Sequence, residues 1–201
     1  MTANMTNGSG VARQRVHTRN IHMESFLRSD GLWDIEATLT DVRDYPSMGV
    51  ERGQIPAGEA LHDIHVCITV DNDLVVKDAS ATMSAHPYHT CPLALPSLAG
   101  LAGGTLARGW RKHVESQLGM ERGCSHIREM LQQMATTAYQ TVPVWWAQQN
   151  GDVIPSRDGK PPQHLGQCKA WSFDGPVVAR IYPEFAGWQT PSADEPPKDP
   201  H

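Results

Sequence analysis

The chain has 201 residues, of which 39% are hydrophobic and 19% charged, and its formal net charge at neutral pH is −5. This length predicts one compact globular domain, and the acidic balance argues against a nucleic-acid partner. No apolar run approaches the roughly 20 residues of a membrane-spanning helix, and residues 1–15 lack the apolar segment of a secretion signal, so we expect a cytoplasmic protein without membrane contact.

Both ends of the chain are polar and poor in the residues that build a core. Residues 1–12 are mostly small and polar, and residues 186–201 are rich in proline and acidic residues. Such segments bury too little apolar surface to offset the entropy lost on ordering, so they are predicted to be disordered tails. A single domain is therefore expected over residues 13–185.

Alternating side chains predict two β-hairpins in the first half of the domain. Residues 32–39 alternate apolar and polar side chains, which is typical of a half-buried strand, and residues 13–26 can pair with them through a Ser-Asp-Gly turn. Residues 64–70 alternate in the same way, and Asp71-Asn72-Asp73 turns the chain back into residues 74–83.

After Pro92 the apolar spacing changes to that of helices. Leucines within residues 93–101 predict a short helix that ends at a glycine-rich break. Apolar residues at helical spacing in residues 106–118 and 127–138 predict two further helices.

The last part of the domain is interrupted by prolines from Gln140 onward. Residues 168–182 are compatible with a hairpin around Asp174-Gly175. Strands followed by helices indicate an α+β fold, in which an antiparallel sheet of hairpins packs against about three helices in two layers.

Potential metal ligands gather at three predicted element ends. Zinc and iron bind thiolates, imidazoles and carboxylates, and these groups converge in α+β domains from loops and element ends. The three ends are His62-Asp63 at the start of the second hairpin, His86 to Cys91 before the first helix, and Cys124-Ser125-His126 at the start of the last helix. Asp63, Cys91, Cys124 and His126 are the predicted ligands of one Zn²⁺ or Fe²⁺ ion.

Cys124 has two further interpretations. Unpaired backbone N–H groups at a helix start lower the pKa of a thiol, so Cys124 is also a candidate nucleophile. Alternatively, Cys124 or Ser125 simply caps the helix, with Glu129 in its first turn. The four cysteines form no C-x-x-C pair, and without an export signal free thiols or metal ligands are favoured over disulfides.

Strand parity separates the neighbouring residues of the second hairpin. If Ile64 and the alternate residues after it face the core, His62 lies on their side and Asp63 and Cys67 lie on the other. Cys67 is about 13 Å along the strand from Asp63, so a half-buried structural thiol is its favoured role. Cys168 has no predicted partner, and a structural thiol is its default interpretation.

Other candidates are weaker. Arg15, Arg19 and Arg28 can anchor a carboxylate or phosphate, but a solvated strand edge explains them as well. The tryptophans at 145, 146 and 171 are more often part of a core cover than of a ligand pocket.

Four segments carry a resemblance to a known family. GLWDIEATLTDVR, GEALHDIHVCITVD, PYHTC and GCSHIREML are similar to a bacterial family described only as domain of unknown function 2889. The resemblance runs from about Arg15 to Pro183. It implies no activity, and it places Asp63, Cys91, Cys124 and His126 in motif stretches.

A more remote resemblance is to the iron-sulfur-cluster assembly scaffold fold. That family places a cysteine and an aspartate at the start of a hairpin, a second cysteine in the middle, and a His-Cys pair at the start of the last helix. The resemblance matches Asp63 to the aspartate and Cys91 and Cys124 to the later cysteines. Leu61 replaces the first cysteine and Gly123 the histidine, which leaves a ligand set suited to a single metal ion.

The sequence favours a metal-dependent enzyme of small-molecule catabolism, either a lyase or a hydrolase. The ion would polarise a substrate oxygen or activate bound water, and one of His62, His86 or His89 would move the proton. If all four ligands bind at once the site would be structural, so catalysis requires Asp63 to be displaceable.

Three alternatives remain open at this point. The first is a carrier or scaffold for an iron-sulfur cluster or sulfur, without turnover. The second is a metal-free enzyme in which Cys124 is the nucleophile beside His126. The third is a plain interaction module. The sequence fixes neither the substrate nor the oligomeric state.

Overall fold

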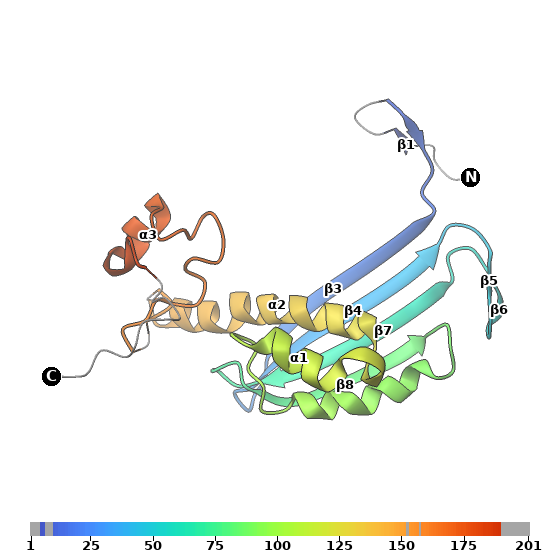
Figure 1. Cartoon of the computed structure of the whole chain (residues 1–201), viewed down its shortest axis with the longest axis horizontal. Helices are drawn as coiled ribbons and strands as arrows, with labels where there is room; N and C mark the ends of the chain where they lie inside the picture. Colours follow the sequence, from blue (N-terminus) through green and yellow to red (C-terminus); the bar gives the residue numbers. More distant parts are fainter. Residues whose placement is uncertain (1–4, 7–9, 152, 157, 190–201) are drawn as a thin grey trace. The chain divides into compact units, whose positions relative to one another are not determined.

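The computed structural model describes residues 5–6, 10–151, 153–156 and 158–189. The chain divides after Pro143 into two compact units, which are described separately. The first unit holds a four-stranded antiparallel sheet (Figure 1). In spatial order its strands are β3 (His17–Leu27), β4 (Trp33–Arg43), β7 (Ala60–Val70) and β8 (Val76–Ala85).

The predicted tails lie largely outside the described residues. Within the range of the N-terminal one, β1 (Met5–Thr6) is described and pairs with β2 (Ala12–Arg13). The extent of a single domain over residues 13–185 stays a prediction.

Both predicted hairpins are confirmed. β3 pairs with β4 along its whole length, and Gly31 takes a positive φ of 83° in the turn between them, a conformation that glycine adopts without steric cost. β7 pairs with β8, and the Asp71 carboxylate caps that turn by accepting hydrogen bonds from the backbone N–H groups of Asp73 and Val75, both at 2.9 Å.

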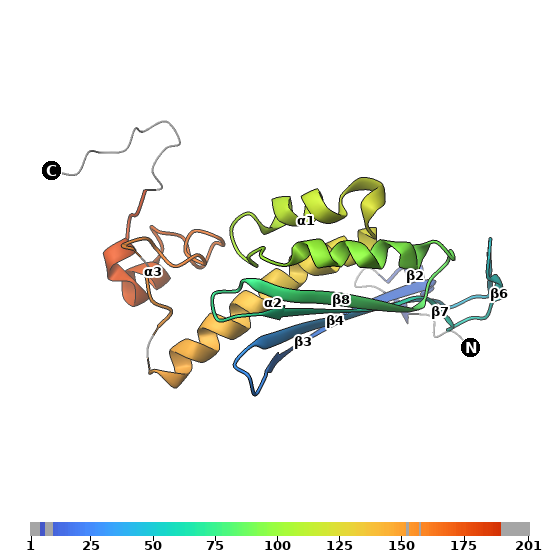
Figure 2. The same cartoon turned by 90° about the horizontal axis from the view of Figure 1, so that it is seen from below.

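Helices cover one face of the sheet. They are η1 (Cys91–Leu101), α1 (Trp110–Leu118), η2 (Met120–Arg122) and α2 (Ser125–Gln149). Figure 2 shows η1 and α1 stacked on one side of the strands. α2 reaches the same side, because its Thr137 and Thr141 donate hydrogen bonds to Met23 Sδ and Ser25 Oγ on β3. The predicted α+β class, a sheet packed against about three helices, is confirmed.

The core lies between the sheet and these helices. The alternate residues of β4 that face the helices are buried, and the register pairs each with a buried residue of β7. Each fully buried Ile or Leu contributes about 1.5–3 kcal/mol relative to an exposed one. The paired rows are Trp33, Ile35, Ala37 and Leu39 on β4 with Val70, Ile68, Val66 and Ile64 on β7.

The opposite face of the sheet is polar. Its β4 residues include Asp34, Glu36 and Thr38, which pair with Thr69, Cys67 and His65 of β7. This set of β4 and β7 residues is called the open face below, because the helices that pack on the sheet all contact its other side.

Two local structures of the first half of the chain and of α2 differ from the sequence-based expectations. α2 continues through Pro143, although proline lacks the N–H that a helix interior uses, because the apolar face around Ala138 and Val142 remains buried. A short hairpin of β5 (Ser47–Gly49) and β6 (Gly53–Ile55), not predicted from the sequence, connects β4 to β7.

The hairpin predicted at residues 168–182 is wrong. That segment holds turns followed by α3 (Pro176–Ile181), and Pro176 at the first helical position presets the backbone for a helix start. In the second unit, α3 and η3 (Pro183–Phe185) enclose a small aromatic-rich cluster centred on Val178, Tyr182 and Phe185. Throughout the described residues, no helix has the length and apolar character needed to cross a membrane.

Candidate metal centre

Polar residues replace the apolar core rows at one end of the sheet. Beyond Leu39 and Ile64, the next helix-facing positions are Asp41 on β4 and His62 on β7, and these two residues are register partners. Arg19 of β3 pairs with Asp41 on the other side. Directly paired residues of antiparallel strands share a face, so three strands place these side chains in one row.

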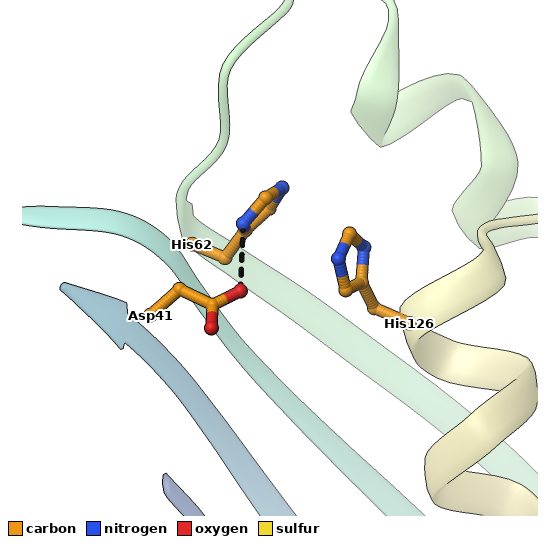
Figure 3. A group of neighbouring side chains, drawn as sticks. All are labelled: Asp41, His62 and His126. Carbon is orange, nitrogen blue, oxygen red and sulfur yellow. Dashed lines mark hydrogen bonds and ion pairs between the residues drawn. The ribbon is translucent and has the colours of Figure 1, made fainter. Parts of the chain in front are cut away.

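His126 reaches this row from the helix layer. It lies in the first turn of α2. Just before this helix, Gly123 packs so close to Leu118 that any side chain at position 123 would clash. The rings of His62 and His126 are 4.1 Å apart between centroids and tilted by 42°. One ligand atom each of Asp41, His62 and His126 lies within 4.8 Å of the others (Figure 3).

The Asp41 carboxylate accepts hydrogen bonds from three side chains. Arg19 donates twice, from Nε and Nη2, each at 2.8 Å, and His17 Nε2 and His62 Nδ1 lie 3.1 and 3.0 Å from its oxygens. The carboxylate is only 2% exposed. Burial opposes its ionisation, but the Arg19 hydrogen bonds and charge outweigh burial and hold the pKa of Asp41 below its ordinary value.

The surroundings of both histidines of the group favour the neutral form. Burial lowers the pKa of His62, and the nearby His126 lowers it further against the attraction of Asp41. Burial also lowers the pKa of His126, with a second contribution from the Arg19 charge. Neutral imidazole is the form that binds metal ions, so protons compete weakly with a cation here.

Hydrogen bonds determine which ring nitrogens are available. An ionised carboxylate can only accept, so Nδ1 of His62 carries the proton of its 3.0 Å contact with Asp41, and an ion bound by both residues would replace that proton. For His126, Nδ1 lies 3.7 Å from the Cys124 sulfur, and Figure 3 shows the other ring nitrogen turned toward His62. For His126, this is the arrangement of a metal-binding histidine whose second nitrogen contacts a neighbouring group.

Two imidazoles and one carboxylate form a set that binds Zn²⁺ or Fe²⁺. Zinc sites with three protein ligands keep a further position for water or substrate, and two histidines with one carboxylate are the ligands of many non-haem iron sites. The identity of the ion does not follow from the donor set, because both ions use these groups.

The structure brings together two of the site residues predicted from the sequence. His126, a predicted ligand, and His62, a predicted proton carrier, belong to the group. Cys124, predicted as ligand and nucleophile, adjoins it through His126. Asp41 takes the place predicted for Asp63, because Asp63 pairs with Thr40 and so belongs to the opposite strand face.

The remaining predicted residues lie apart from this group. Within the residues that the structure describes, Cys91 and Asp63 join no cluster of three or more ligand atoms. His89 is 83% exposed beside Glu51, and His86 bonds to the carbonyl of Tyr88. Arg15 pairs with Asp44 and Arg28 with Asp30, so both are engaged at the surface.

Sequence reasoning missed Asp41, although a signal was present. The apolar alternation of residues 33–39 predicts that position 41 also faces the core, and a carboxylate at a core position needs a partner. Arg19 was considered only as a solvent-exposed or anion-binding group, since its register with Asp41 depends on the turn between the strands.

Comparisons with known proteins identify the family of the chain. The model of a family described as protein of unknown function (DUF2889) matches residues 17–140, which include Asp41, His62, Cys124 and His126. No curated protein and no solved structure matched the chain. The resemblance to the iron-sulfur scaffold fold therefore has no support from these comparisons.

Proposed function

This chain belongs to the DUF2889 family, whose function is unknown; starting from its site alone, we propose that it is a metal-dependent enzyme acting on a small molecule. Asp41, His62 and His126 hold one divalent ion, Zn²⁺ or Fe²⁺. The observation that carries the proposal is the convergence of three ligand atoms within 4.8 Å from three separate elements.

The surroundings of the group support a metal ion over a purely structural ion pair. A structural pair needs only Arg19 and Asp41, which already form a bidentate contact. Two histidines of lowered pKa, whose rings pack against each other beside that carboxylate, go beyond what such a pair needs and are suited to a cation.

Three protein ligands leave room for catalysis. An ion held by them supplies a Lewis acid for a carbonyl or hydroxyl oxygen, or activates a water molecule. A hydrolase or a lyase uses that chemistry without a further cofactor. His17 contacts Asp41 and has a side chain that is 47% exposed, so it is the group placed to exchange protons with solvent.

Elemental analysis of protein purified without a histidine tag tests the proposal. The native chain is expected to contain about one zinc or iron ion per chain. His62→Gln and His126→Gln are each expected to lose the ion, because each removes one of the three ligands. His65→Gln is the matched control, since His65 contacts Glu36 across the same two strands on the open face.

Two results would contradict the proposal. One is native protein without metal even after incubation with excess Zn²⁺ or Fe²⁺. The other is metal content that His62→Gln and His65→Gln reduce equally.

One observation favours a second candidate, a metal-free cysteine enzyme. The Cys124 sulfur lies 3.7 Å from His126 Nδ1, the geometry of a nucleophile beside a base. The lowered pKa of His126 opposes this reading, because a thiolate dyad needs the imidazole to hold the proton. Turnover that persists in metal-free protein and disappears in Cys124→Ser would favour the cysteine enzyme.

A further inference from the structure

Arg43 points to the kind of substrate that the metal site takes. It is the last residue of β4, and its register partner on β3 is His17. His17 contacts Asp41, and paired residues share a face, so Arg43 lies on the same side of the sheet as the metal group. Resting on the proposed function, we propose that Arg43 binds the carboxylate of an anionic small-molecule substrate.

The guanidinium of Arg43 has no hydrogen-bond or ion-pair partner among the described residues. The other arginines of this edge are engaged: Arg15 with Asp44 at 2.7 Å, and Arg19 with Asp41 and Glu129. Arg43 is nevertheless partly buried, and its backbone carbonyl accepts a 2.8 Å hydrogen bond from Gly58 that fixes this end of the strand. An unpaired, partly buried guanidinium beside a catalytic group is suited to bind an anion.

The charges around the site favour an anion as well. Arg19 offsets Asp41, and Arg15 offsets Asp44. With Glu129 on Arg19 and Arg43 included, these charges balance, so a divalent ion would leave this end of the sheet positive, although the whole chain has a formal charge of −5. A single planar guanidinium matches the two oxygens of a carboxylate, whereas phosphate sites commonly combine several donors.

The strand geometry sets the spacing that the substrate must span. Arg43 lies two residues along β4 from Asp41, a distance of about 7 Å between their backbone positions. The substrate therefore carries its carboxylate a few bonds away from the oxygen that reaches the metal ion.

Two hydroxamates test this inference in the full-length, zinc-loaded protein. Both acetohydroxamate and the monohydroxamate of succinic acid bind zinc, but only the second carries a free carboxylate. Calorimetric titration is expected to show that the acidic probe binds wild-type protein about tenfold more tightly, as a charge-assisted hydrogen bond to Arg43 would give.

The variants separate the role of Arg43 from that of the metal. Arg43→Gln is expected to bind both probes equally while retaining its zinc and its affinity for acetohydroxamate, and Arg43→Lys is expected to keep part of the preference. Arg111→Gln, at an exposed position of α1, is the control and keeps the full preference.

The outcomes distinguish this inference from the function on which it rests. Equal affinity of wild-type protein for the two probes, or a preference that survives in Arg43→Gln, overturns the role of Arg43 and leaves the metal site standing. Absence of zinc from the wild-type protein overturns both.

Discussion

Each face of the sheet carries one contact between a histidine of β7 and a carboxylate of β4, in a different environment. On the helix-covered face, His62 of β7 contacts Asp41 of β4 at 3.0 Å, and their side chains are 14% and 2% exposed. On the open face, His65 contacts Glu36 across the same strands at 3.2 Å, but these side chains are 40% and 35% exposed. Three residues along one strand thus separate a buried pair from a solvated one.

The difference lies in what surrounds each pair. The buried carboxylate is neutralised by Arg19, and a second histidine from α2 packs against His62. The open pair is reached by water, which screens its charges and weakens their interaction. A carboxylate–histidine contact becomes a candidate site only where burial, a counter-charge and a further ligand coincide.

The largest expected effect is on the free energy of unfolding when the buried carboxylate loses its charge. Asp41→Asn keeps the shape of the side chain but leaves the guanidinium of Arg19 facing a neutral amide. We expect a loss of about 3 kcal/mol, measured by urea unfolding of metal-free protein.

Glu36→Gln is the matched change on the open face. It is expected to cost less than about 1 kcal/mol, because exposed pairs contribute little. Equal costs for the two variants would show that burial does not distinguish the pairs.

The next effect is stabilisation by metal. At a free Zn²⁺ concentration one hundred times the dissociation constant, the free energy of unfolding is expected to rise by about 2.7 kcal/mol, since the ion binds only the folded site. His126→Gln should abolish the increase and His65→Gln should retain it, measured by urea unfolding with and without the ion. A similar rise in both variants would place the ion elsewhere.

Acidification is expected to destabilise the metal-free protein. The pKa values of His62 and His126 are lowered from the ordinary 6.5, so below that pH the unfolded chain binds protons that the folded chain excludes. The free energy of unfolding therefore falls as the pH drops below about 6.5, until the folded histidines titrate as well. At lower pH, protonation of Asp41 removes the stability that its lowered pKa provides.

Two variants test whether this pH dependence of the free energy of unfolding comes from the buried histidines. His62→Gln should flatten the pH dependence of unfolding, while His65→Gln leaves it in place. Unfolding followed from pH 7 to pH 5 in the presence of a chelator measures both, and an unchanged slope in His62→Gln would contradict the assignment.

The smallest effect on stability is expected at Cys67 of the open face. Cys67→Ser should change the free energy of unfolding by less than about 1 kcal/mol.

The reactivity of Cys67 gives a separate prediction. Burial raises the pKa of the thiol to about 11, helped by Asp34 and Glu36, from an ordinary 9.0. Iodoacetamide near pH 8 should therefore modify Cys67 roughly a hundredfold more slowly than an ordinary thiol, as peptide mass mapping can test.

The fold was largely predictable from the sequence, because local patterns specify it. Alternation in residues 32–39 and 64–70 identifies the two central strands, and the Asp71 turn identifies the connection of β7 to β8. The third helix was recognised, but its predicted pattern stops at residue 138 and the helix continues to Gln149, since burial of Val142 is a tertiary effect that proline statistics do not include.

The candidate site was predictable only in part. His62 and His126 could be selected because histidines at element ends are conspicuous. Asp41 was overlooked because acidic residues are usually exposed, and its burial depends on the pairing with Arg19. Sequence spacing does not determine how far apart loops lie: Cys124 adjoins the group through His126, whereas Cys91 is not part of it.

The three ligand groups come from β4, β7 and the start of α2, at positions 41, 62 and 126. No contiguous fragment that lacks either the central strands or that helix can assemble them. Capture of an ion should therefore report the moment at which the helix docks on the sheet, and a stopped-flow experiment with a chromogenic zinc chelator can time this step during refolding.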